Sequence, residues 1–258
     1  MNDGATRYER DGNIARVTFD RPAARNAMTW AMYEQLAAAC EKIAADREVR
    51  VAVFRGAGGK AFVAGTDIGQ FREFRSGEDG IAYERRVAEY LALVEQLPVP
   101  TLAVIEGWAI GGGLAIACAC DLRIATPGTR FGVPIARTLG NCLSVENCAL
   151  LVAAFGASRT KKMLMLAENL TAEEAAIAGF LSEIIPTDRL DARAGELCDR
   201  FANNAPITMR VTKESIRRAL HAGLPSGEDL IRESYGSKDF HEGVEAFVAK
   251  REPRWKGQ

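Results

Sequence analysis

Hydrophobic residues recur along this 258-residue chain in two patterns, and the first dominates the N-terminal half. Short apolar runs there alternate with stretches in which apolar residues return every three or four positions. The runs predict strands at residues 6–10, 13–19, 49–55, 101–105 and 121–126. Asp11-Gly12 predicts a hairpin between the first two strands, and Thr29 is a good N-cap for a helix over 30–45. Short strands separated by crossover helices predict an α/β core.

The segment before the central strand at 101–105 is harder to interpret. An apolar helical face ending before Pro98 is formed by Tyr83, Val87, Tyr90, Leu91 and Val94. Residues 70–86 are dense in charge and contain Gly77 and Gly80, and they predict a mobile loop between helical pieces.

After about residue 145 the repeat of apolar residues every three or four positions takes over, and it predicts that nearly all of this segment is helical. Thr171 and Glu174 form a capping box, with Gly179 as the C-cap. Further helices are expected over 189–204, 206–221 and about 238–250. These amphipathic helices predict a helical appendage whose apolar faces are covered by other copies of the chain.

Composition narrows the function. The net charge of −1 gives no reason to expect nucleic acid or an anionic membrane as a partner. The six cysteines show no metal spacing and favour a reducing compartment, and both histidines lie in the C-terminal third. The polar N-terminus shows no signal peptide, and the apolar segment 108–120 is too short to span a bilayer. A cytoplasmic protein without metal, flavin or nicotinamide is therefore expected.

Two turns of small residues, each after a strand, are the strongest candidates for chemistry. They are Ala64-Gly65 and Gly111-Gly112-Gly113. Backbone N–H groups from two such turns can converge into an oxyanion hole, which stabilises negative charge on a carbonyl oxygen. Tight packing of a helix against a strand explains the second turn equally well.

These turns belong to a longer series of motifs. Arg21-Pro22 with Asn26-Ala27, Phe62-Val-Ala-Gly-Thr-Asp-Ile68, Gly107 to Gly113 with Cys120-Asp121, Phe131-Gly132-x-Pro134, Thr171 to Ala175 with Gly179, and Asp239-Phe240 to Lys250-Arg251 follow one another in order. This series resembles the crotonase (enoyl-CoA hydratase/isomerase) superfamily over nearly the whole chain.

The resemblance implies a spiral of ββα units over residues 1–195 and a C-terminal helical oligomerisation region over 196–258, assembled as a trimer or a dimer of trimers. It implies a CoA thioester substrate, an enolate-like intermediate and a role in fatty acid metabolism, with CoA present only as part of the substrate. The oxyanion donors would be the backbone N–H groups of Ala64 and Gly112. Residues implied in binding the CoA thioester are Arg25, Ala27, Ala64, Asp67, Ile68, Gly112, Phe247 and Lys250.

The sequence departs from the family at its acid/base residues. The two glutamates used by hydratases are replaced by Ala115 and Ile135, and Leu143 stands where some relatives carry an acid. Glu146 is the next carboxylate along the chain and is the candidate acid/base, although a solvent-facing role at a helix start is the simpler interpretation. Other candidates are Arg137, as a partner for a substrate carboxylate, Asn141, Cys142, and Tyr83, Glu84 and Tyr90 in the preceding helical stretch.

Three hypotheses remain open at this point. The first is an enoyl-CoA hydratase or isomerase. The second is another enolate reaction, such as decarboxylation of a carboxyacyl-CoA, which needs no base to start. The third is a homologue that binds acyl-CoA or assembles with a partner enzyme and catalyses little.

Overall fold

The larger of two β-sheets organises the protein. The computed structural model describes residues 4–257. The strands of this sheet lie in the order β1 (Ala5–Asp11), β2 (Ile14–Asp20), β3 (Val51–Gly56), β5 (Thr101–Ile105), β7 (Leu122–Ala125) and β10 (Glu183–Ile184). β1 and β2 form the predicted antiparallel hairpin, and the other neighbours are parallel. Both faces are covered, since Phe54 and Val53 of the same strand enter different hydrophobic clusters. The expected α/β core is confirmed.

A second, smaller sheet positions the site and was not predicted. Its order is β4 (Ala61–Ala64), β6 (Trp108–Ile110), β8 (Arg130–Gly132) and β9 (Leu170–Thr171). Strands of two to four residues are too short to show a period in the sequence. β4 and β6 are parallel neighbours with Ala64 opposite Ile110. Because parallel strands end at the same edge, the two small-residue turns emerge side by side.

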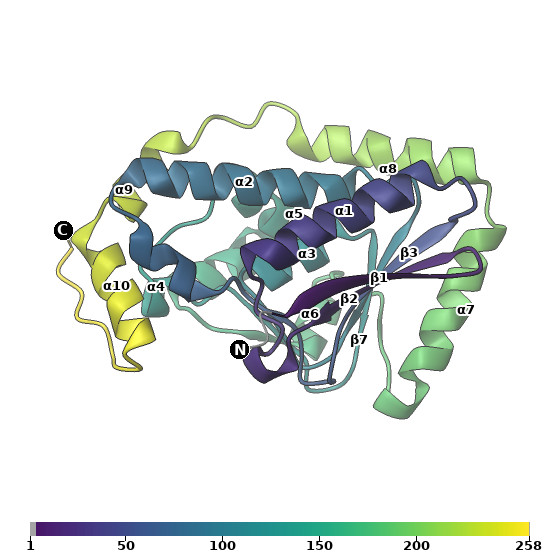
Figure 1. The fold of residues 1–258 in the computed structure, drawn as a ribbon, viewed down its shortest axis with the longest axis horizontal. Helices are drawn as coiled ribbons and strands as arrows, with labels where there is room; N and C mark the ends of the chain where they lie inside the picture. Colours follow the sequence, from purple (N-terminus) through teal and green to yellow (C-terminus); the bar gives the residue numbers. More distant parts are fainter. Residues whose placement is uncertain (1–3, 258) are drawn as a thin grey trace.

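Helices cover these sheets and extend from them (Figure 1). In the first two thirds of the chain they are α1 (Trp30–Ala45), α2 (Gly77–Glu95), α3 (Gly112–Ala119), α4 (Ile135–Thr138), α5 (Val145–Met165) and α6 (Ala172–Ile177), with 3-10 turns at Pro22–Ala24 (η1), Ile68–Glu73 (η2) and Thr187–Arg189 (η3). The Thr29 hydroxyl accepts from the Met32 N–H and caps α1 as predicted. The capping box of Thr171 and Glu174 at α6 is also confirmed.

The prediction of a loop over residues 70–86 was wrong, because α2 already begins at Gly77. The Asp79 carboxylate accepts hydrogen bonds from the Arg75 and Ser76 N–H groups and fixes this start. Gly77 and Gly80 are contact points for another helix, as described below, rather than sites of backbone freedom.

Four helices end the chain: α7 (Leu190–Asn203), α8 (Pro206–His221), α9 (Glu228–Tyr235) and α10 (Lys238–Val248). The expected boundary after residue 195 falls inside α7, whose Leu190 and Leu197 pack into the same cluster as Val53. α9 and α10 gather at the opposite end of the molecule, beside the start of α2 (Figure 1). No helix within residues 4–257 is long and apolar enough to cross a membrane.

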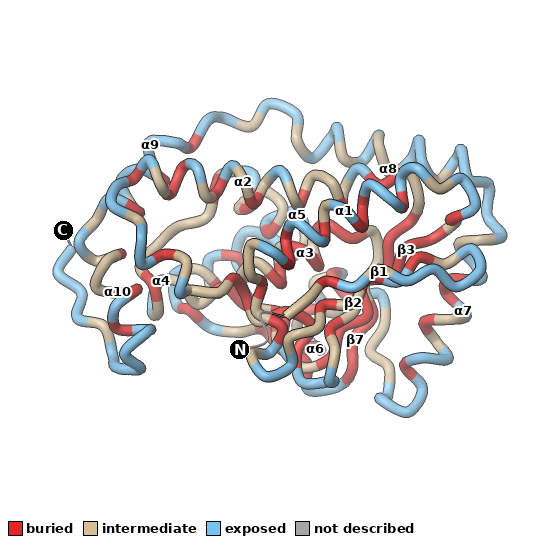
Figure 2. Tube along the Cα trace, viewed as in Figure 1, coloured by how far each residue is buried: buried red, intermediate tan, exposed pale blue. Residues whose placement is uncertain are grey.

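The protein buries its sheets but leaves α8 largely uncovered (Figure 2). Large apolar side chains are exposed on this helix at Ile207, Val211, Ile216 and Leu220. Exposed apolar side chains of this size favour a partner that covers them. The expectation of an oligomer stays a prediction.

Candidate active site

The glycine turn places the start of α3 at a cavity. Gly111 has φ of +54°, a left-handed conformation that favours glycine, and Gly112 is the first residue of the helix. A Cβ on Gly112 would lie 2.7 Å from Tyr33 Oη, and one on Gly113 would lie 2.0 Å from the Val63 carbonyl oxygen. The first N–H of a helix has no intrahelical partner, so the Gly112 N–H is a donor at the cavity wall.

The second predicted donor, the Ala64 N–H, is already engaged. It donates to the Arg25 carbonyl oxygen at 3.0 Å. The Asn26 side chain holds this loop in place: its Oδ1 accepts from the Arg21 N–H at 2.9 Å, and its Nδ2 donates to the carbonyls of Ala57 and Ala61 at 2.9 and 2.8 Å. A substrate carbonyl would therefore have to share or displace the Arg25 carbonyl at Ala64.

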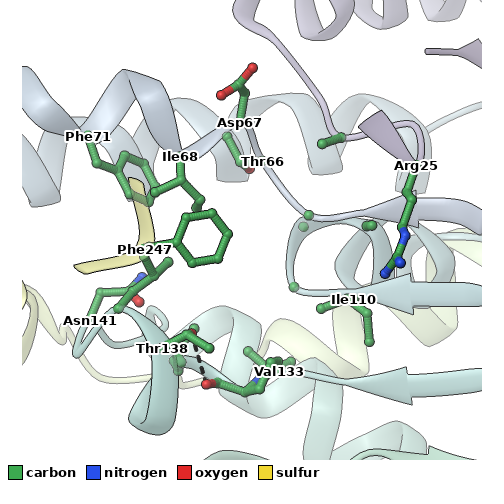
Figure 3. A pocket seen from close by; sticks show the side chains of 18 of the residues that line it. Arg25, Thr66, Asp67, Ile68, Phe71, Ile110, Val133, Thr138, Asn141 and Phe247 are labelled. Atoms are coloured by element: carbon green, nitrogen blue, oxygen red, sulfur yellow. Dashed lines mark hydrogen bonds between the residues drawn. The ribbon is translucent and has the colours of Figure 1, made fainter. Parts of the chain in front are cut away.

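A cavity of about 450 Å³ opens at these turns (Figure 3). Phe247, Ile68 and Phe71 lie along one side of it, and Arg25 lies on the other. The structure thus brings together nearly all residues implied in substrate binding, and those lining the cavity are Arg25, Ala27, Ala64, Asp67, Ile68, Gly112 and Phe247. Phe247 is 50% exposed, so its ring is available to a ligand.

Four of the residues proposed from the sequence lie outside the lining of the cavity. Glu146, in the first turn of α5, Arg137 on α4, and Lys250, just after α10, are exposed and lie outside the cavity lining. Burial raises the pKa of the Cys142 thiol to about 11, so it stays protonated and is a poor nucleophile near neutral pH.

Within residues 4–257, two carboxylates line the cavity: Asp67, which is paired with Arg21, and Glu84, on α2. Glu84 is only 4% exposed, yet it lines the cavity together with Gly112. Glu84 Oε1 accepts from the Tyr235 hydroxyl at 2.8 Å, and Oε2 accepts from the Ser144 N–H at 3.1 Å and more weakly from Asn147 Nδ2 at 3.5 Å. Burial raises the pKa of Glu84 to about 7, against the lowering effect of these bonds. A carboxylate with this pKa is suited to exchange protons near neutral pH.

A side cavity of about 40 Å³ adjoins Glu84 and lies next to Ala115. Glu84, Tyr83, Gly112 and other residues line both cavities, so the two are neighbours. Alanine at 115 leaves this space open. The volume of the side cavity exceeds the roughly 10–15 Å³ that a water molecule needs.

Sequence reasoning named Glu84 but chose Glu146. The signal was present in the spacing, since Gly80, Glu84, Val87, Leu91 and Val94 recur at three- or four-residue intervals and are all buried. A single carboxylate on such an apolar stripe is the pattern that could have identified it. The assumption that residues 70–86 formed a loop hid this stripe.

Comparison with known proteins decides the family. The sequence profile of the family described as enoyl-CoA hydratase/isomerase matches residues 9–258. The chain belongs to this family. It is 32% identical over 254 residues to the 2,3-dehydroadipyl-CoA hydratase of Escherichia coli, covering 96% of this chain and 97% of that protein. These matches support membership of the crotonase superfamily. They also support the expectation that the protein is an enzyme with an acyl-CoA substrate.

Solved structures of the superfamily share the fold. A crystal structure of an enoyl-CoA hydratase/carnithine racemase from Magnetospirillum magneticum matches with a TM-score of 0.80 and 34% identity, covering 100% of this chain and 97% of that chain. A methylmalonyl-CoA decarboxylase in complex with 2-nitronate-propionyl-CoA matches with a TM-score of 0.90, covering 98% and 99%. Its 23% identity supports the shared fold alone.

Proposed function

We propose that this protein moves a proton on a CoA thioester through an enolate, with Glu84 as the acid/base group. The observation that carries the proposal is the buried Glu84 carboxylate in the same cavity as the Gly112 N–H. The Gly112 N–H would hold the thioester oxygen, and the Ala64 N–H would join it if the Arg25 carbonyl yields. No metal, flavin or nicotinamide is needed, and CoA enters only as part of the substrate.

One carboxylate is best suited to a 1,3-proton shift. Glu84 would remove a proton from C2 of a 3-enoyl-CoA, and the C–H electron pair would delocalise into the thioester as a dienolate. The same proton would then return to C4, so that the double bond moves from C3–C4 to C2–C3. Glu84 ends as it began, and no co-reactant is consumed. A positioned acid/base group of this kind contributes about 10²- to 10⁴-fold in rate.

Hydration of a 2-enoyl-CoA is the second candidate. The 32% identical relative is named a hydratase, and the side cavity beside Glu84 has room for a water molecule. Glu84 would take a proton from that water as the oxygen adds to C3, and it would then deliver a proton to C2.

An uncharged acyl group fits the cavity better than a carboxyacyl group. Within residues 4–257, the cationic side chains lining the cavity are Arg21 and Arg25. Arg21 is paired with Asp67 at 2.8 Å, and Arg25 is at the exposed edge. A substrate carboxylate near Glu84 would be desolvated beside another acid without a cationic partner, which is costly. This argues against the decarboxylase hypothesis.

The test offers the purified protein 3-enoyl-, 2-enoyl- and carboxyacyl-CoA esters and identifies products by mass spectrometry. Conversion of the 3-enoyl ester to its 2-enoyl isomer, lost about 10²- to 10⁴-fold in Glu84→Gln, is expected. Glu89→Gln, an exposed site on the same helix, is the matched control and should keep full activity. A water adduct alone would favour hydration. Loss of CO₂, or binding without turnover, would refute the proposal.

The oxyanion donor has its own matched pair of variants. Gly112→Ala and Gly112→Pro both place a Cβ against Tyr33 Oη, but only proline removes the N–H. Proline is tolerated at the first position of a helix, so the backbone can accept it. We expect Gly112→Ala to keep about 10²- to 10³-fold more activity than Gly112→Pro, because the two variants share the added Cβ and differ in the N–H donor. Equal activities would exclude this N–H as the donor.

We also propose assembly as a trimer or a dimer of trimers, in keeping with the exposed apolar side chains of α8. Sedimentation equilibrium gives the mass directly. A monomer at micromolar concentration would refute this assembly.

A further inference from the structure

Tyr235 reaches the Glu84 carboxylate from the C-terminal part of the chain. Its residue is fully buried on α9, and its hydroxyl donates to Glu84 Oε1 at 2.8 Å. Asn141 Nδ2 donates to the same phenol oxygen at 3.1 Å. Because the amide N–H uses a lone pair of that oxygen, the phenol keeps its own proton for Glu84.

Two glycines on α2 make this approach possible. A Cβ on Gly80 would lie 2.2 Å from Cγ of Tyr235, and one on Gly77 would lie 2.2 Å from the Arg232 carbonyl oxygen. No larger residue fits at either position without moving α9. The two glycines face the same helix one turn apart, and Glu84 follows Gly80 by one further turn. The glycines thus form a notch through which the Tyr235 ring reaches the carboxylate.

Ion pairs at the rim fix the same contact. Arg85 pairs with Glu228 at 2.9 Å, and Glu78 pairs with Arg232. Each pair joins α2 to α9, so α9 is held in register along α2 on either side of the buried contact. Exposed pairs of this kind add little stability but limit sliding.

Tyr235 makes the shortest of the contacts to Glu84. The Ser144 N–H bond is 3.1 Å and the Asn147 contact is 3.5 Å. A hydrogen bond to a carboxylate oxygen favours the ionised form, and at a buried site it offsets the cost of desolvation. The Ser144 bond comes from the main chain and only proline would remove it, whereas a conservative side-chain substitution removes the Tyr235 bond.

We propose that Tyr235 is a positioning residue that holds the Glu84 carboxylate in place and favours its ionised form near neutral pH, so that helix α9 sets the base strength of the site. The inference rests on the proposed function of Glu84. It assigns the C-terminal part of the chain a role in proton transfer besides any role in assembly.

The titratable groups that face Glu84 do not disturb a measurement of its titration near neutral pH. Burial raises the pKa of each neighbouring hydroxyl and thiol, so all of them stay protonated at neutral pH, and Glu146 is the remaining acidic neighbour. These hydroxyls and thiols are Tyr33 on α1, Tyr83 on α2, Tyr235 on α9, Cys142 before α5 and Cys148 on α5. A titration near pH 7 that disappears in Glu84→Gln therefore belongs to Glu84.

The experiment compares Tyr235→Phe with Tyr83→Phe. Phenylalanine keeps the ring in the notch, so the fold is retained. Tyr83 is the matched control, because its hydroxyl donates to Thr66 Oγ1 at 3.0 Å and not to Glu84. Tyr235→Phe should raise the Glu84 midpoint by about one to two pH units, a tenfold to hundredfold change in proton affinity. The acid limb of kcat/KM should move by the same amount.

The midpoint is read without substrate by NMR of protein carrying ¹³C at the glutamate side-chain carboxyl, with Glu84→Gln assigning the signal. A shifted midpoint in Tyr235→Phe but not in Tyr83→Phe supports the proposal, even if no CoA ester turns over, in which case only the proposed function falls. Unchanged midpoints, or equal shifts in both variants, would overturn it. Loss of stability with an unchanged midpoint would show a structural role alone.

Discussion

Replacing Glu84 with glutamine should remove activity and, at alkaline pH, stabilise the protein. The pKa of Glu84 is about 7 in the folded state against the usual 4.5. The folded state therefore holds the proton more tightly than the unfolded state. The contribution of this group is fully present below about pH 4.5 and is lost as pH rises through about 7.

The magnitude follows from the shift. A difference of about 2.5 pKa units corresponds to about 3 kcal/mol at pH 8. Glutamine stays neutral and escapes this cost, but one of its two ends cannot match the present donors. If its oxygen accepts from the Ser144 N–H, its amide faces the Tyr235 hydroxyl, and the mismatch costs about 1 kcal/mol. We expect Glu84→Gln to be about 2 kcal/mol more stable than the native protein at pH 8, and no more stable at pH 4.5.

Urea denaturation of both proteins at a series of pH values between 4.5 and 8 measures this difference. The free energies of unfolding of Glu84→Gln and of the native protein should diverge as pH rises from 4.5 to 8. Glu89→Gln, exposed on the same helix, should show no pH-dependent difference from the native protein. A constant difference between Glu84→Gln and the native protein would refute the reasoning, because it would mean that the folded state does not penalise the ionised carboxylate.

Other predictions concern the frame of the site, and each is measured by urea denaturation. Asn26→Ala removes the three buried hydrogen bonds that hold the loop beside Ala64, and we expect a loss of about 2–4 kcal/mol. Gly113→Ala should lose about 1–3 kcal/mol, because its Cβ would lie 2.0 Å from a backbone oxygen of Val63. Gly195→Ala, inside α7, should gain about 0.5–1 kcal/mol, since its Cβ would meet no heavy atom within 4 Å. A gain at Gly113 would contradict the backbone geometry at the proposed site, and a loss at Gly195 would contradict the open surroundings of that position in α7.

Local sequence signals predicted the elements whose capping or turn residues lie within the element or directly beside it. The helix after Thr29, the capping box at Thr171 and the hairpin at Asp11-Gly12 all rest on contacts within a few residues, and all are confirmed. The resemblance to the crotonase superfamily supplied the order of the motifs, and the lining of the cavity follows it closely. The short strands β4 and β6, which join the two turns, depend on pairing between distant segments and left no local signal.

The proposed acid/base group, Glu84, was missed for a tertiary reason. Proximity in sequence to the Phe-Gly-x-Pro segment favoured Glu146, yet the chain turns so that this residue faces solvent. Glu84 comes from a helix more than fifty residues earlier, and only packing places it beside Gly112. Glycines at 77 and 80 suggested flexibility, because a single sequence does not reveal whether a glycine serves backbone freedom or close approach.

The two parts of the proposed site, the glycine turn and the proton-transfer group, tolerate amino-acid substitution to different degrees. The proposed oxyanion turn depends on backbone geometry, and the Cβ contacts at Gly112 and Gly113 leave little freedom there. A proton-transfer group needs only a carboxylate that reaches the cavity, and any surrounding helix can supply one. Ala115 and Ile135 line the two cavities without supplying an acid, and the proposed function assigns proton transfer instead to Glu84, whose burial raises its pKa to about 7.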